Sequence, residues 1–194
     1  GNSFSFLMQN STLLLRDSVL ASQSAFFVIS WPNCSSGHFS SINVLNTVAV
    51  TTTSYLGQSA GVLLFAWLDQ DSGDSASVHV GENTRIQASS STFGVTAAVI
   101  TLFWLSNGTA GRDGVIRIDG GAELSLDNVY LSPAASLIVA LWQGGGGGGC
   151  SLIVEDVVIS GYNISSERNA RLLQVAQPGD SFLLTTNGTT RVDL

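Results

Sequence analysis

The sequence contains no lysine, and all seven of its basic residues are arginine. Charged residues make up only 11% of the chain, and its fourteen acids give a formal net charge of −7. Domains that bind nucleic acid usually carry a basic patch, so this balance argues against a nucleic-acid partner. No apolar run approaches the roughly 18 residues of a membrane-spanning helix, and we expect no direct membrane insertion by this segment.

A phrase of small and apolar residues that ends in tryptophan returns through the chain. It occupies residues 25–31, 60–67, 97–104 and 135–142, and a fifth copy at 170–177 has glutamine in the tryptophan position. Trp31, Trp67, Trp104 and Trp142 follow one another at intervals of 36, 37 and 38 residues. A fixed period of this size is typical of a solenoid or another repeat array.

Each repeat combines short alternating segments with loops rich in Gly, Asn, Asp, Ser and Pro. The alternation predicts β-strands, and the loop residues predict turns. Residues 78–88 align without gaps on residues 116–126, so the repeat extends beyond the tryptophan phrase. We therefore predict an all-β, right-handed parallel β-helix of about five coils, with roughly 36 residues and three strands per coil.

The predicted coils cover residues 4–38, 39–74, 75–113, 114–149 and 150–180, with a partial coil at 181–194. A free-standing solenoid needs polar caps at its ends, and neither end of this sequence supplies one. We expect a single β-helix segment that is a fragment of a longer protein.

The tryptophan phrases are apolar on both alternating phases. The second and fourth residues before each tryptophan should point into the core. The other phase would form an apolar outer strip, larger than a soluble monomer usually exposes. The candidate interaction face is Val62, Leu64, Val99, Phe103, Leu137 and Val139. Loops of this chain, another part of the parent protein or a partner could cover it.

Several phrases resemble a known family. They are S-T-L-L-L-R-D-S-V-L from residue 11, A-E-L-S-L-D-N-V-Y-L-S-P from residue 122, and V-V-I-S-G-Y-N-I-S-S-E-R-N-A-R-L-L-Q from residue 157. They are similar to the dispersed gene family surface proteins of trypanosomes. The resemblance implies a large, glycosylated, membrane-anchored or secreted protein with a β-helical ectodomain that acts in adhesion. It implies no catalytic residues.

Five N-x-S/T sequons occur, at Asn10, Asn33, Asn107, Asn163 and Asn187. Most fall in predicted turns, where a glycosylation acceptor must lie. We expect these asparagines to be exposed and glycosylated, and the protein to be extracellular. The expected partners are a host or cell-surface protein, a glycan, or the rest of the parent chain.

No catalytic set emerges from the residue pattern, and we expect neither enzymatic activity nor a cofactor. The alternative is a carbohydrate-active β-helix enzyme, a polysaccharide lyase or glycoside hydrolase, or a glycan-binding module. Such an enzyme would use acids that converge from neighbouring coils, for instance Asp17 with Asp127 or Asp156. These acids belong to a repeated phrase, which a role in turns explains more simply.

Two further groups carry a possible chemistry. Asp69, Asp71 and Asp74 form a weak candidate site for Ca²⁺, because their spacing departs from a calcium loop and a solvated acidic turn explains them better. Cys34 and Cys150 fall in equivalent loops three coils apart, some 14 Å at about 4.8 Å per coil, whereas a disulfide needs Cα atoms within about 7 Å. We expect no disulfide between them.

Overall fold

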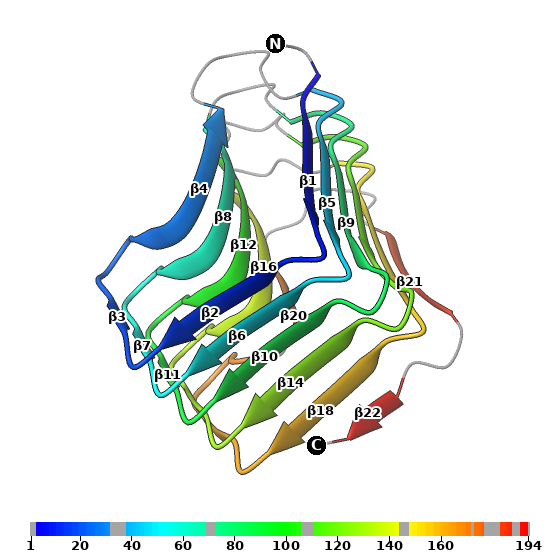
Figure 1. Cartoon of the computed structure of the whole chain (residues 1–194). Helices are drawn as coiled ribbons and strands as arrows, with labels where there is room; N and C mark the ends of the chain where they lie inside the picture. Colours follow the sequence, from blue (N-terminus) through cyan, green and yellow to red (C-terminus); the bar gives the residue numbers. More distant parts are fainter. Residues whose placement is uncertain are drawn as a thin grey trace.

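The computed structural model describes residues 3–31, 38–68, 73–105, 111–143, 148–171, 173–176, 183–187 and 191–193. These residues form a parallel β-helix with four sheets, and each coil contributes one strand to a sheet before the chain passes to the next (Figure 1). None of the described segments forms an apolar helix of membrane-spanning length.

The four sheets are named A to D in the order in which a coil visits them. Sheet A contains β1 (Ser5–Gln9), β5 (Ser41–Leu45), β9 (Ser77–Gly81), β13 (Val115–Ile118), β17 (Ser151–Glu155) and β21 (Leu183–Asn187). Sheet B contains β2 (Thr12–Arg16), β6 (Val48–Thr52), β10 (Arg85–Ser89), β14 (Glu123–Asp127), β18 (Val158–Tyr162) and β22 (Arg191–Asp193). Sheet C contains β3 (Val19–Leu20), β7 (Tyr55–Leu56), β11 (Thr92–Phe93), β15 (Tyr130–Leu131) and β19 (Ser165–Ser166). Sheet D contains β4 (Ala25–Trp31), β8 (Gly61–Trp67), β12 (Ala98–Leu105), β16 (Ser136–Gln143) and β20 (Leu173–Ala176).

The prediction of a parallel β-helix is confirmed, but the prediction of three strands per coil is wrong. The additional strand belongs to sheet C, whose members are only two residues long. A pair of residues is too short to show alternation, so the sequence pattern merged each of these strands with the turns around it.

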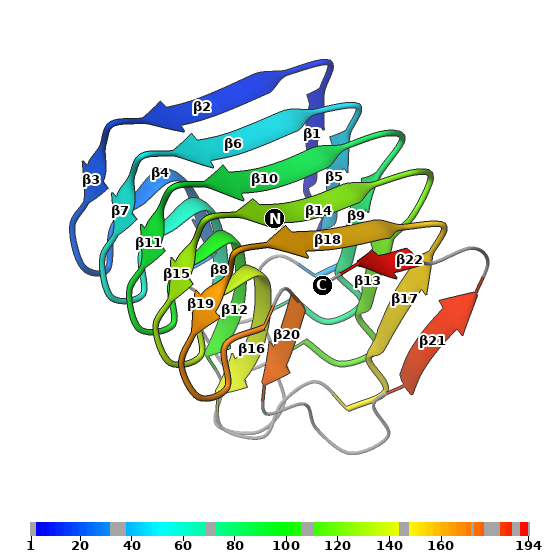
Figure 2. The same ribbon diagram turned by 90° about the horizontal axis from the view of Figure 1, so that it is seen from below.

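The hand of the coil can be followed in the figures. In Figure 1 the chain runs down β1, across β2 and up through β3 and β4, which is a clockwise path. Figure 2 shows the same molecule from below, with the first coil at the top and the later coils beneath it. The top of Figure 2 is the front of Figure 1, so in Figure 1 each later coil lies farther from the viewer. A clockwise path that recedes is a right-handed coil, as predicted for parallel crossovers.

The corners of the coils use left-handed backbone. At the corner between sheets B and C, the φ angles are 48° at Asp17, 50° at Thr53, 46° at Ser90, 52° at Asn128 and 50° at Asn163. Asn and Asp tolerate this conformation because their short polar side chains can bond locally, whereas a β-branched residue is strained in it. The repeated Asp and Asn of the sequence therefore mark corners of the coil.

Replacing Thr53 with asparagine should stabilise the protein. Thr53 is the β-branched member of its corner column, with a φ of 50°. Relief of this strain should raise the free energy of unfolding by about 0.5–1 kcal/mol in urea denaturation. The matched control is Thr52→Asn, one residue earlier in β6, where no such gain is expected. Equal unfolding midpoints for the two variants would contradict the explanation.

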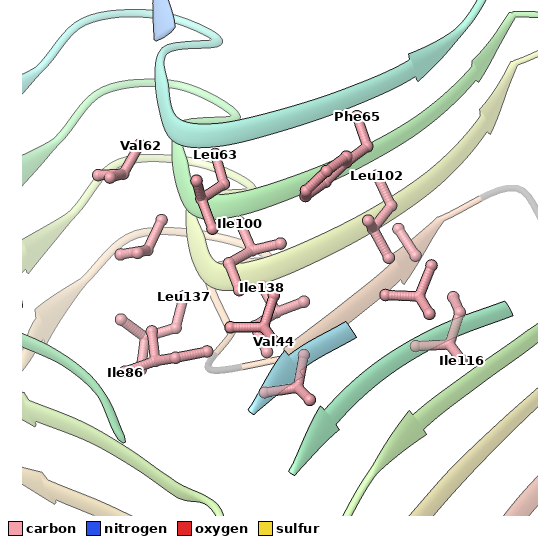
Figure 3. Packing of buried hydrophobic residues seen from close by; sticks show 14 of the residues in the cluster. Val44, Val62, Leu63, Phe65, Ile86, Ile100, Leu102, Ile116, Leu137 and Ile138 are labelled. Atoms are coloured by element: carbon pink, nitrogen blue, oxygen red, sulfur yellow. The ribbon is translucent and has the colours of Figure 1, made fainter. Parts of the chain in front are cut away.

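The interior is filled by the side chains that the sequence pattern assigned to it. In the middle coils, the residues two and four positions before each tryptophan are at most 1% exposed: Leu63, Phe65, Ile100, Leu102, Ile138 and Ala140. Figure 3 labels five of them, and their side chains point into the space that the sheets enclose: Leu63, Phe65, Ile100, Leu102 and Ile138. In the first and fifth coils, Ile29, Leu173 and Val175 pack against this core but are only partly buried. Phe27, in the first coil, is 38% exposed, so its assignment to the core is wrong.

Three members of the predicted interaction face lie in this core instead. Val62, Val99 and Leu137 are 3%, 0% and 0% exposed. The pairing of β12 with its neighbours passes from Ala98 directly to Ile100, so the ladder is interrupted at this position. The strands bend there, and the side chain that alternation would turn outwards stays inside. Their assignment to the outer face is therefore wrong.

Replacing Leu102 with alanine should cost about 2–5 kcal/mol of unfolding free energy, because it opens a cavity in a fully buried layer. Leu102 is 0% exposed, and its register partners are Phe65 and Ala140. Leu64→Ala, on the partly exposed outer phase of the neighbouring coil, is the control and should cost less. A loss below about 1 kcal/mol for Leu102→Ala would show that the inward phase is wrong.

Candidate binding groove and charged cluster

The outer side of sheet D is hollowed into a groove of about 480 Å³. Figure 1 shows that the strands of this sheet curve inwards between the short strands of sheet C and their own C-terminal ends. The groove is lined by Gln23, Ser59, Leu64, Thr96, Thr101, Phe103, Ala134, Val139, Leu141 and Gln174. The bend that takes Val62 and its equivalents into the core also shapes this surface.

The floor of the groove is built from two columns of outward side chains. In the first, Thr101 pairs with Leu64 on one side and with Val139 on the other. In the second, Phe103 lies between Ala66 and Leu141. Because neighbouring strands are about 4.8 Å apart, the groove follows the axis of the β-helix across several coils.

The rim of the groove is the corner between sheets C and D. It presents one residue with positive φ from each coil, including Gln23 (58°), Ser59 (55°), Thr96 (57°) and Ala134 (59°). The Ser59 and Thr96 hydroxyl oxygens lie 2.8 Å apart, and Thr96 Oγ1 donates to the carbonyl oxygen of Val95 at 2.7 Å. The Ser59 hydroxyl therefore donates to Thr96, and the remaining lone pairs are acceptors.

Three residues of the predicted interaction face line this groove: Leu64, Phe103 and Val139, of which Val139 is only 6% exposed. That this face binds a partner stays a prediction. Sequence reasoning missed the rim residues, because turn residues carry no alternation signal. The loops that follow the tryptophans lie partly outside the described residues, so cover by these loops stays a prediction.

A second feature, on the outer side of sheet A, is a cluster of charged residues from three coils. His79 Nε2 lies 2.6 Å from Asp119 Oδ1, and the guanidinium Nη2 of Arg117 lies 2.6 Å from Glu155 Oε2. Arg117 Nε also donates to Asp119. A Cβ added to Gly81 would lie 2.5 Å from both Asp119 Oδ1 and His79 Nε2, so the missing side chain makes room for the cluster.

The charges in this cluster change the ionisation of Asp119. Burial alone would raise the pKa of Asp119, but the hydrogen bonds from His79 and Arg117 outweigh burial and hold the pKa below its ordinary value. The same hydrogen bond to Asp119 raises the pKa of Arg117. Asp119 is therefore ionised at neutral pH, and the cluster is an ion-pair network that joins neighbouring coils.

Asp119→Asn should lower stability at neutral pH by about 1–2 kcal/mol, since it weakens charge-assisted hydrogen bonds at a partly exposed site. Because folding lowers the pKa of Asp119, its ionised form stabilises the folded protein at every pH above the ordinary pKa of 3.8. This stabilisation is lost as the pH falls through the lowered pKa of the folded protein. The difference between wild type and variant should therefore shrink in urea titrations below that value. The exposed Glu82→Gln serves as control. A difference that does not change with pH would contradict the linkage.

The remaining candidate acids do not gather. Arg112 donates hydrogen bonds to the carboxylate of Asp74. Its backbone nitrogen lies 2.9 Å from Oδ1, and its guanidinium Nη2 lies 2.8 Å from Oδ2. Asp69 and Asp71 lie outside the described residues. Within the described ranges, no group of three or more His, Cys, Asp or Glu residues is arranged to hold a metal ion.

The acids of the enzyme alternative are also separated. Asp17 occupies the corner between sheets B and C in the first coil, whereas Asp156 occupies the corner between sheets A and B four coils later. Asp127 ends β14, in register with Arg16 through three ladder steps, a separation of about 14 Å. The repeated phrase gives Asp17 and Asp156 the same position in the sequence, although they lie at different corners of the coil. For this reason the sequence suggested that the two acids could lie close together.

Cys150 is a free, buried thiol. It is 1% exposed, and its sulfur lies 2.6 Å from the carbonyl oxygen of Gly111. Burial raises its pKa to about 11, so the thiol is protonated and weakly reactive at neutral pH. Cys34 lies outside the described residues, and the absence of a disulfide between the two stays a prediction.

Two sequon asparagines occupy exposed corners of the coil. Asn10 joins β1 to β2 and accepts a hydrogen bond from Asn46 Nδ2 at 2.6 Å. Asn163 lies between β18 and β19, and its Nδ2 donates to Asn128 at 2.9 Å. Asn33 and Asn107 lie outside the described residues, and Asn187 is the last residue of β21. Glycosylation at all five stays a prediction.

The β-solenoid fold that the family resemblance implied is present, with in-register parallel pairing from the first coil to the last described strand. The groove and the charged cluster both lie on its outer surface. Comparison of the chain with protein-family models, with curated proteins and with solved structures found no match.

Proposed function

We propose that this chain is a non-enzymatic structural and adhesive module of a large, glycosylated cell-surface or secreted protein. The groove on sheet D carries this proposal. Its ten lining residues form a mostly apolar floor and a mostly polar rim, and none has an ionisable side chain. General acid–base catalysis needs such groups, whereas binding needs apolar area with a few placed hydrogen-bonding atoms.

The setting on a cell surface has separate support. Asn10 and Asn163 lie at exposed corners, where a glycan would not disturb the core. The resemblance to the dispersed gene family surface proteins of trypanosomes points in the same direction. In such a protein the β-helix would hold the groove away from the membrane, and its partner would be a host or cell-surface protein or glycan, or another part of the parent chain.

The adhesive function can be tested with a charge placed in the groove. Beads coated with the wild-type protein should retain target cells, and Phe103→Asp should abolish retention without unfolding the chain. The matched control is Phe39→Asp, because Phe39 is 68% exposed, lies outside the groove and has a φ of 52° that aspartate tolerates. Equal retention by wild type and Phe103→Asp would overturn the proposal.

A second candidate, a carbohydrate-active enzyme, is favoured by the cluster of His79, Arg117, Asp119 and Glu155. Glycoside hydrolases use a pair of carboxyl groups, and the cluster contains two. In this protein Arg117 engages both carboxylates, an arrangement better suited to joining coils than to acting on a substrate. Release of reducing ends from a panel of neutral and uronate polysaccharides, lost in Asp119→Asn, would place this candidate first.

A further inference from the structure

The groove on sheet D is uncharged although the protein is acidic. The formal net charge is −7, but the described residues that line the groove include no Asp, Glu, Arg or His. An anionic ligand would meet the repulsion of the whole protein with no cation among the lining residues to offset it. A cationic ligand would find no carboxylate in the groove. The charge distribution therefore selects for a neutral ligand.

The hydrogen-bonding rim makes a second selection. The Ser59 hydroxyl donates to Thr96, and the Thr96 hydroxyl donates to a backbone carbonyl, so the protons of both are already used. What these two side chains offer to a ligand is lone pairs. A ligand that satisfies them must bring hydrogen-bond donors without charge, and hydroxyl groups have this property.

The floor of the groove further restricts the class of ligand. Phe103 presents an aromatic ring between Ala66 and Leu141, and Leu64 extends the apolar surface towards the previous coil. A ligand that packs on this floor while it donates to the rim must have an apolar face and a hydroxyl edge. A pyranose ring combines the two, because its C–H face packs on aromatic rings and its hydroxyls lie at the edge.

The direction of the groove makes the last selection. Equivalent floor and rim positions return with each coil, about 4.8 Å apart along the axis. A linear ligand made of repeating units can use such a series, whereas a compact ligand cannot. An extended peptide fits less well, because strands β8, β12 and β16 are paired on both sides and offer no free edge.

We propose that the groove binds a neutral, linear polysaccharide along the axis of the β-helix. One sugar ring packs on Phe103, and sugar hydroxyls donate to Ser59 and Thr96. This proposal rests on the proposed adhesive function and names its class of ligand.

The test is a titration of the whole chain with neutral hexasaccharides of glucose, mannose and N-acetylglucosamine, followed by NMR or calorimetry. At least one should bind, and Phe103→Ala should weaken its affinity at least tenfold. Thr96→Val removes the rim acceptor and should weaken it several-fold. Phe39→Ala, outside the groove, should leave it unchanged, and a galacturonate hexasaccharide should bind more weakly.

Other outcomes would overturn the inference. These are no binding of any neutral hexasaccharide at millimolar concentration, binding that Phe103→Ala does not change, or preference for the galacturonate probe. If Phe103→Asp abolishes cell retention while no sugar binds, the adhesive function stands and the ligand is a protein. Dimerisation that Phe103→Asp abolishes, in light scattering, would instead assign the groove to a second copy of the chain.

Discussion

Trp104→Ala should lower the free energy of unfolding by about 3–5 kcal/mol, one of the largest losses expected for a single substitution in this chain. Trp104 is 2% exposed and stacks between Trp67 and Trp142, with ring centroids 4.5 and 4.6 Å away. Removal of the indole leaves a large cavity and breaks two stacking contacts at once. Urea denaturation measures the loss.

Trp104→Phe is the matched comparison, because it keeps an aromatic ring in the column and should recover part of the loss. Trp31 provides a second comparison, since it stacks on Trp67 but has no described indole beyond it. Trp31→Ala should therefore cost less than Trp104→Ala. The reverse order would contradict the view that the stack contributes to stability beyond the burial of each ring.

Gly111→Ala is expected to cost about 2–4 kcal/mol, from a left-handed backbone angle and a steric clash together. Gly111 has a φ of 70°, and an added Cβ would lie 2.7 Å from Trp104 Cδ1 and from Trp142 Nε1. Real Cβ atoms do not approach so closely, so the indole stack or the loop must shift. The loss is measured by urea denaturation.

Gly121→Ala separates the two causes. Gly121 has a φ of 78°, but an added Cβ would meet only Asn83 Oδ1, at 3.2 Å. It should therefore show the conformational cost alone, about 1 kcal/mol. Equal losses for the two variants would show that contact with the tryptophans does not matter.

The tryptophan column was predictable because it repeats at nearly constant spacing. The pairing of Trp104 with Trp67 and Trp142 follows directly from aligning the phrases that contain them. The inward phase was predictable for the same reason, since every member of it is apolar. The short strands of sheet C were not, because two residues cannot display a period.

The bend in sheet D explains why part of the predicted interaction face lies in the core. Both phases of the tryptophan phrase are apolar, but for different reasons. Val99 is apolar because the interrupted ladder leaves it in the core, and Phe103 is apolar because it forms the floor of the groove. A one-dimensional pattern gives these two residues the same signal, and only the path of the strand separates them.

The charged cluster could have been found from the sequence. The alignment of residues 78–88 on residues 116–126 places His79 on Arg117, and these two are register partners. The same alignment places Asp119 on Gly81, where a missing side chain leaves space. The sequence signal for the cluster was that one coil has a glycine, Gly81, at the position where the next coil has an acid, Asp119. The bonding geometry, in contrast, depends on rotamers that no spacing specifies.

The most direct test of the account is the circular dichroism of the indoles. Because the coils stack in register, Trp31, Trp67, Trp104 and Trp142 form one column with centroid separations of 4.5–4.8 Å. Indoles held this closely and in fixed geometry should give an exciton couplet that weakens most in Trp67→Phe and Trp104→Phe, and less in Trp31→Phe. A folded protein with no couplet, or with a couplet that no tryptophan substitution changes, would contradict the in-register β-helix.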